Sequence, residues 1–258
     1  MSGVMAYFAD AAGYPPDVLA LLAAAAFLAG LARGFSGFGS ALIFMPLASA
    51  LTEPKVAAPL LLIADLPLSA WLVPRAWPYS NKRDVALISL GALVCLPLGA
   101  LVLAHGDPVM IRWMQAFFLL PLVLLLMAGW RYHSQPHAGL TVLAGGVSGF
   151  LSGVAQLGGP PVVLYWLGGS IRSDLVRANI ISYFAISTTI ALISFFATGL
   201  ITRSLLWVTV LAMPAYTIGA YFGTRMFGLA SEVVFRRICY ALILGSIVVG
   251  LPIMDKLR

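Results

Sequence analysis

Long apolar runs dominate the chain, and most of them end at a charged residue, a proline or a glycine. A helix needs about 20 apolar residues to cross the core of a bilayer. Strong candidates for such helices are Pro54–Pro74, Asp84–Ala104, Pro108–Trp130, Asp174–Gly199, Arg203–Phe227 and Glu232–Met254. Since their ends carry the residues that usually stop helices, the pattern predicts a membrane-spanning helix over each.

Two further apolar stretches, Asp17–Leu51 and His137–Leu167, are interrupted by glycines near their middle. Within the second stretch, the piece Gly158–Leu167 is too short to span a bilayer. Each stretch is therefore interpreted as two pieces around a break, and a re-entrant hairpin is one form of it. The chain is expected to be all-α, a polytopic bundle of about eight to ten hydrophobic segments.

The distribution of Lys and Arg indicates how the broken stretches are arranged. If each enters and leaves on the same face, the loops divide into nine basic residues against five, with Arg33 inside the first break. If each crosses once, the division is seven against seven. The positive-inside rule favours the first arrangement. It places both termini outside and makes the two halves of the chain inverted relative to each other.

The two halves also share spaced residues. The pattern Gly30-x3-Gly34-x4-Gly39 recurs 119 positions later as Gly149-x3-Gly153-x4-Gly158, and Gly99-Ala100 recurs 120 positions later as Gly219-Ala220. We predict two inverted repeats, residues 1–134 with a break near 33–40 and residues 135–258 with a break near 153–161. Inverted repeats with broken helices are typical of secondary transporters, in which the breaks mark the binding site.

Composition and charge narrow the class of protein. The chain has 258 residues, of which 61% are hydrophobic and only 9% charged, so it cannot cover a soluble globule with charge. A soluble enzyme, a disordered chain and a disulfide scaffold are excluded. The net charge is +6, but no basic run is longer than two residues. This distribution favours the positive-inside bias of a membrane protein over nucleic-acid binding. Cys95 and Cys239 have no metal-ligand or disulfide spacing, and no cofactor, metal or cleavable signal peptide is expected.

Arg33 and Asp65 are the two charged residues placed deepest within apolar segments. An arginine at the bilayer centre costs roughly 2.5–3.5 kcal/mol on insertion scales, so it needs a partner or a function. Its guanidinium is suited to binding an oxyanion, and the alternative is an arginine that snorkels or caps carbonyls. The Asp65 carboxylate is a candidate carrier of a coupling proton, or a counter-ion for Arg33 when the site is empty; the alternative is a position close to the interface.

Small and polar groups surround the two breaks. A broken helix frees backbone N–H groups, and a half-helix N-terminus attracts anions, so Pro160 and Pro161 indicate a helix that starts near Gly159. The alternative function of the glycines is close helix packing. The candidate substrate-binding residues are Arg33, Ser36, Gly37, Gly39, Ser40, Gln156, Gly158, Gly159 and Asn179.

At the two breaks the chain resembles the TauE/SafE sulfite-exporter-like permeases. The resemblance is carried by Arg33-Gly-Phe-Ser-Gly-Phe-Gly-Ser-Ala-Leu-Ile-Phe-Met-Pro46 and Gly149-Phe-Leu-Ser-Gly-Val-Ala-Gln-Leu-Gly-Gly-Pro-Pro-Val-Val-Leu-Tyr165. It implies a multi-pass permease of the cytoplasmic membrane, with about eight helices from a duplicated unit. It also implies outward movement of sulfite, organosulfonates or related sulfur-containing anions. Two departures from the family pattern, Gly39-Ser40-Ala41 and Gln156, lie where selectivity would be set.

The leading hypothesis is an anion permease, not an enzyme, that works by alternating access with the two breaks facing each other near the midplane. A proton on Asp65 is the expected coupling ion. One alternative is an intramembrane serine hydrolase, because Gly34-Phe-Ser-Gly37 resembles a rhomboid-type nucleophile motif. Another is a non-transporting membrane subunit. The expected partners are a small sulfur anion and the lipid bilayer, and an oligomer is compatible with the sequence.

Overall fold

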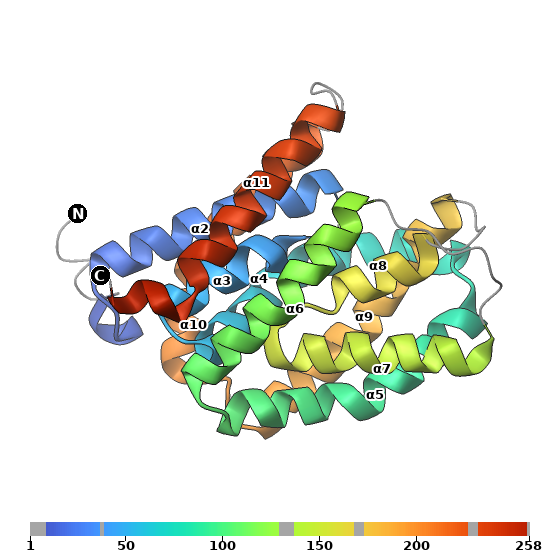
Figure 1. Ribbon diagram of the computed structural model, residues 1–258, viewed down its shortest axis with the longest axis horizontal. Helices are drawn as coiled ribbons and strands as arrows, with labels where there is room; N and C mark the ends of the chain where they lie inside the picture. The colour runs from blue at the N-terminus through green and yellow to red at the C-terminus, as the bar shows by residue number, and fades with distance from the viewer. Residues whose placement is uncertain (1–8, 37–38, 129–136, 168–172, 227–231, 257–258) are drawn as a thin grey trace. The chain divides into compact units, whose positions relative to one another are not determined.

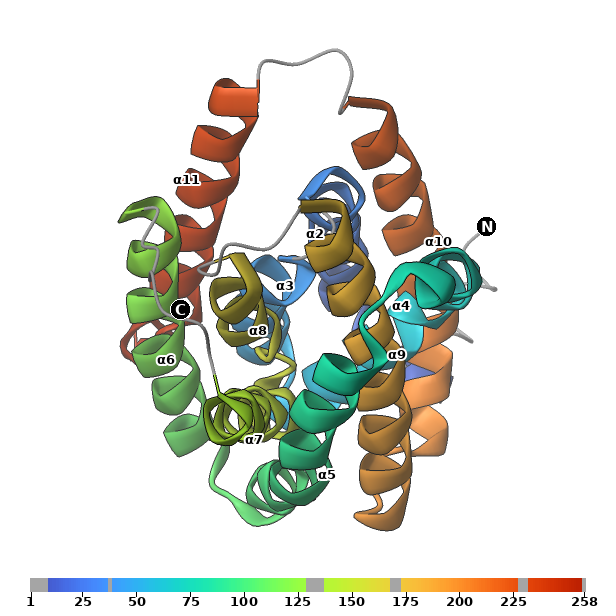
Figure 2. The same ribbon diagram turned by 90° about the vertical axis from the view of Figure 1, so that its right-hand side faces the viewer.

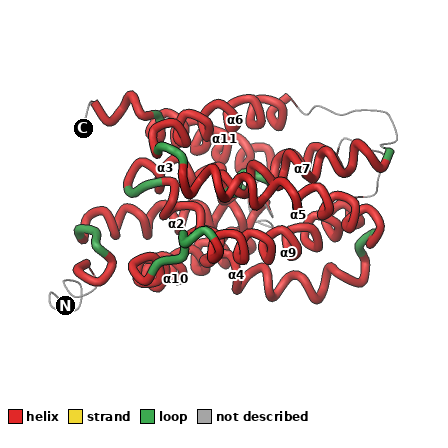
Figure 3. The backbone as a smooth tube through the Cα atoms, turned by 90° about the horizontal axis from the view of Figure 1, so that it is seen from below, coloured by secondary structure: helices red, strands yellow, loops and turns green. Residues whose placement is uncertain are grey.

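A computed structural model describes residues 9–36, 39–128, 137–167, 173–226 and 232–256. Every regular element in these ranges is a helix, and loops join them without any strand (Figures 1 and 3). The helices are α2 (Pro16–Ser36), α3 (Ser40–Leu51), α4 (Pro54–Ala76), η1 (Trp77–Tyr79), α5 (Lys82–His105), α6 (Pro108–Ala128), α7 (Ala138–Ala155), α8 (Gly159–Leu167), α9 (Ser173–Ala197), α10 (Arg203–Met226), α11 (Glu232–Gly250) and η2 (Pro252–Lys256).

Seven of the described helices are long and apolar enough to cross a membrane: α2, α4, α5, α6, α7, α9 and α10. The prediction of an all-α polytopic membrane protein is therefore confirmed. The final predicted span is shorter than expected, because α11 ends at Gly250 and the chain continues through Pro252 as a 3-10 turn. Proline has no N–H with which to continue the helical ladder.

The chain forms two compact units, and each unit combines segments from both halves of the sequence. Unit 1 contains residues 1–65, 107–120 and 199–258, and unit 2 contains residues 66–106 and 121–198. The units do not follow the predicted boundary at residues 134 and 135, because the main packing partner of each broken helix lies in the other half of the chain. The duplication and its inverted arrangement remain predictions about the sequence.

In unit 1, α2 packs closely against α10 through small residues. A Cβ on Gly30 would lie 2.1 Å from the carbonyl oxygen of Tyr216. A Cβ on Gly34 would lie equally close to the carbonyl oxygen of Ala220. No side chain fits at either glycine, so the two backbones touch. Because both residue numbers rise together along the contact, α2 and α10 run parallel.

In unit 2, α5 and α7 make the corresponding contact and lie side by side (Figures 1 and 2). A Cβ on Gly145 would lie 1.8 Å from the carbonyl oxygen of Ile88. A Cβ on Gly153 would lie 2.2 Å from that of Leu96. These helices are also parallel. Close helix packing, which the sequence allowed for the repeated glycines, is thus what surrounds Gly30, Gly34 and Gly153, as in small-residue interfaces between membrane helices.

We expect Gly153→Ala to destabilise the protein by about 1–3 kcal/mol, because its methyl group would overlap the α5 backbone. The matched control is Gly139→Ala in the same helix, where a Cβ meets nothing within 4 Å. This control gains up to about 1 kcal/mol of helix propensity. Unfolding midpoints of the purified variants in detergent provide the measurement. Equal midpoints for both variants would contradict the close packing.

Candidate functional site

The first break separates α2, which ends at Ser36, from α3, which begins at Ser40. Gly39 has a φ of 99°, a left-handed conformation that glycine adopts without steric cost. Gly37 lies outside the described residues, and so does the side chain of Ser36. A break near residues 33–40, as the glycine pattern predicts, is confirmed.

The direction of α3 follows from its contacts with α11. The hydroxyl of Ser246 donates to the Leu42 carbonyl, and Gly250 lies against Pro46, so α3 and α11 run parallel. Figure 2 shows that α10 and α11 run in opposite directions. Since α2 is parallel to α10, α3 turns back along α2. The first broken stretch is therefore a helical hairpin.

The second break is also a reversal. Gln156 closes α7 in a left-handed conformation with a φ of 56°, and its N–H donates to the Ser152 carbonyl at 2.9 Å. The Ser148 hydroxyl donates to the Gly158 carbonyl at 2.6 Å, and the hydroxyls of Thr141 and Tyr165 lie 2.6 Å apart. Because residue numbers on α8 rise as those on α7 fall, α8 runs back along α7.

Gly158 is held tightly within this second turn. A Cβ there would lie 1.9 Å from the Ser152 hydroxyl oxygen, so no side chain fits. The Ser148 hydroxyl that contacts its carbonyl also lies 2.8 Å from the hydroxyl of Tyr183. Helix α8 begins at Gly159 with two prolines in its first turn, as predicted. The polar side chains described at the second break, which are the hydroxyls of Ser148, Ser152 and Tyr183 and the amide of Gln156, are all neutral.

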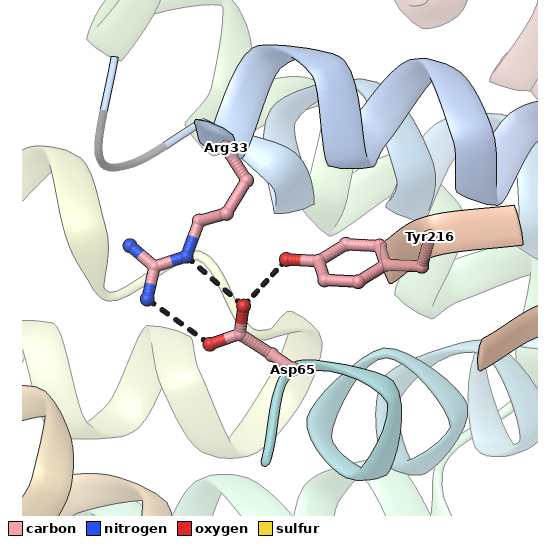
Figure 4. Close-up of polar contacts among 3 residues, drawn as sticks. All are labelled: Arg33, Asp65 and Tyr216. Carbon is pink, nitrogen blue, oxygen red and sulfur yellow. Dashed lines mark hydrogen bonds and ion pairs between the residues drawn. The ribbon is translucent and has the colours of Figure 1, made fainter. Parts of the chain in front are cut away.

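Two charged side chains of unit 1, Arg33 and Asp65, meet near the first break (Figure 4). The guanidinium of Arg33 binds Asp65 in a bidentate manner, with Nε and Nη2 each donating to a different carboxylate oxygen at 3.0 Å. The hydroxyl of Tyr216 donates to the first of these oxygens at 2.5 Å. Three donors from two helices thus converge on one carboxylate. The opposite charges of Arg33 and Asp65 balance each other inside the helix bundle.

The lengths of two helices bring Asp65 to Arg33 although 32 positions separate them in the sequence. Helix α3 runs back from the break for 12 residues, or about 18 Å. The part of α4 from Pro54 to Asp65, also 12 residues, then returns over about 18 Å. Asp65 therefore arrives again near the level of the break, halfway along α4.

Ser40 and Tyr216 complete this group. The Ser40 side chain is in hydrogen-bonding contact with the phenol of Tyr216. Tyr216 is fully buried and was not among the predicted site residues. The signal that could have indicated it is its place in the middle of an apolar span, away from the ends where interfacial tyrosines occur.

The two polar side chains predicted from the second half have defined local contacts. The Gln156 amide donates to the Ser152 carbonyl at 3.1 Å. The Asn179 side-chain oxygen accepts from the Asn81 backbone N–H at 2.7 Å, next to the start of α5. Their part in substrate binding remains a prediction. Within the described ranges, no group of three or more His, Cys, Asp or Glu side chains could hold a metal ion.

The sequence is similar to that of known proteins. Residues 22–250 match the family described as Sulfite exporter TauE/SafE. The chain is also similar to a protein of Cupriavidus necator named "Probable sulfite/organosulfonate exporter TauE". The two are 24% identical over 222 residues, which cover 81% of this chain and 84% of that protein. No solved structure matches the chain.

The apolar helices, the two reversals and this match define a multi-pass membrane transporter. The chain belongs to the sulfite exporter TauE/SafE family, because the match extends over most of its length. The resemblance seen in the two break motifs is therefore confirmed.

Gln156 offers a test that separates its backbone from its side chain. We expect Gln156→Gly to keep the reversal and to be as stable as the parent protein or more stable, since glycine removes about 1 kcal/mol of left-handed strain. If the amide binds the substrate, the KM for transport rises several-fold in liposomes while the unfolding midpoint is preserved. An unchanged KM would remove Gln156 from the predicted site.

Proposed function

We propose that the protein exports a small sulfur-containing oxyanion, either sulfite or an organosulfonate, across the cytoplasmic membrane by alternating access. The observation that carries this proposal is a buried arginine, Arg33, at the end of a broken helix and beside the start of the next helix. A guanidinium binds oxyanions through charge-assisted and often bidentate hydrogen bonds, which are roughly twice as strong as neutral ones.

The geometry of Arg33 supports an oxyanion as its ligand. The guanidinium already engages two oxygens of one carboxylate through a planar fork. Sulfite and sulfonates present pairs of oxygens to the same fork. Ser40, at the N-terminal end of α3, contacts the Tyr216 phenol and adds a hydroxyl and the positive end of a helix dipole to this group.

The remaining predicted residues have supporting functions in this proposal. Asp65 neutralises Arg33 in the empty protein and carries a coupling proton. Gly39 permits the sharp turn that begins α3. Gly158 lies where no side chain fits before α8, and Gly159 is the first residue of α8. Gln156 and Asn179 belong to unit 2 and stay predicted substrate-binding residues because their side chains are neutral and polar.

Export of methanesulfonate from liposomes tests the function, since this sulfonate keeps a single negative charge across the usable pH range. We expect Arg33→Ala to reduce export at least tenfold. This change removes the positive charge that balances Asp65. The double variant Arg33→Ala with Asp65→Asn removes both charges, and it is expected to be equally inactive. Loss of a single partner from a buried ion pair costs roughly 3–5 kcal/mol, which the double variant avoids.

The matched control is Arg225→Ala. Arg225 lies on α10 of the same unit, is exposed and stacks on the ring of Tyr221 at 5.1 Å. This variant is expected to export at the rate of the parent protein. Export at the parental rate by the double variant would contradict the proposed function of Arg33.

A further inference from the structure

The Asp65 carboxylate lies where an oxyanion would be expected to bind. It accepts two hydrogen bonds from Arg33 and one from Tyr216, and each comes from a donor suited to a sulfur oxyanion (Figure 4). The donors hold a negative group of two oxygens in a fixed orientation. A second anion on the same fork would face the carboxylate at close range, and like charges at such a distance repel strongly.

We propose that the Asp65 carboxylate and the transported anion bind the same donors, Arg33 and Tyr216, in turn, and that Tyr216 positions whichever of them is bound. This proposal rests on the proposed function, because it requires Arg33 to bind the anion. It adds a mechanism of coupling and assigns a function to Tyr216.

The exchange requires one proton. When a proton binds a carboxylate oxygen of Asp65, the negative charge disappears, the ion pair with Arg33 is lost, and the guanidinium becomes available to the anion. When the anion leaves, the acid releases its proton to water and the carboxylate returns to Arg33. One proton thus accompanies each anion, and a monovalent anion crosses without net charge.

The surroundings of Asp65 suit this exchange. Among its described contacts, Asp65 binds the charged Arg33 of α2 and the phenol of Tyr216 on α10, and that phenol in turn contacts the neutral hydroxyl of Ser40 on α3. The Asp65 side chain is 20% exposed, whereas that of Arg33 is 8% exposed, so the carboxylate is the more accessible partner. The more accessible partner is thus the Asp65 carboxylate, which has to bind a proton before it separates from Arg33.

The burial and contacts of Tyr216 suit a positioning residue. Its phenol is fully buried, and its backbone lies against Gly30 of α2, three residues before Arg33. One helix contact therefore fixes both the phenol and the guanidinium. A hydroxyl at this point stabilises the carboxylate and afterwards donates to an anion oxygen in the same place.

The test is the pH dependence of the KM for methanesulfonate in liposomes. In the parent protein the fraction of protein able to bind falls with loss of the Asp65 proton, so the KM rises by up to about tenfold per pH unit on the alkaline side. In Asp65→Asn the KM is expected to be independent of pH, whereas Asp107→Asn, a change at an exposed helix cap in the same unit, keeps the parental profile.

Tyr216→Phe separates positioning from packing, because it removes the hydroxyl and keeps the ring. We expect the KM at acidic pH to rise several-fold and the start of the alkaline rise to move to higher pH, since the carboxylate loses a donor. Tyr221→Phe, an exposed position on the same helix, is the control and changes neither value. An unchanged pH profile in Tyr216→Phe would overturn its assignment.

Proton counting in the parent protein avoids variants altogether. A pH-sensitive dye inside the liposomes is expected to report about one proton for each methanesulfonate ion. Zero protons per anion, or an Asp65→Asn variant that retains the alkaline rise, would overturn the exchange. If the exchange is overturned but Arg33→Ala abolishes export, the proposed function stands without the exchange. If Arg33→Ala exports normally, both proposals fail.

Discussion

A charged group inside a hydrocarbon layer must be paired, and the bidentate ion pair between Arg33 and Asp65 satisfies this constraint in unit 1. Buried ion pairs add little net stability, because the cost of leaving water offsets the attraction between the charges. Replacing a buried ion pair by apolar residues of similar volume is often neutral or stabilising. The pair is therefore better explained by binding than by folding.

Close packing of small residues gives this pair its geometry. Gly30 allows the α10 backbone to approach α2 so closely that the Tyr216 carbonyl would leave no space for a methyl group. The same contact directs the Tyr216 phenol toward Asp65 (Figure 4). In unit 2, Gly145 and Gly153 bring α5 and α7 together in the same way, but the polar groups near that break are hydroxyls and an amide. Of the two breaks, the first therefore holds the charged groups.

Much of this arrangement follows from the sequence. Apolar length and punctuation predicted the helices, and glycine spacing predicted both breaks, because these features act locally along the chain. The charges of Arg33 and Asp65 stood out for the same reason. Tyr216 did not, since a tyrosine in an apolar span is an ordinary residue until its neighbours are known. The two units were also not foreseen, because periodicity within a helix does not identify the helix that packs against it.

The central claim is that the anion replaces a carboxylate on Arg33. A crystal structure of the protein at acidic pH with bromomethanesulfonate tests it most directly, because the anomalous signal of bromine locates the ligand. The account predicts a sulfonate group within hydrogen-bonding distance of the Arg33 guanidinium and the Tyr216 hydroxyl, with Asp65 displaced from the fork. A sulfonate bound elsewhere, with the ion pair between Arg33 and Asp65 intact, would contradict it.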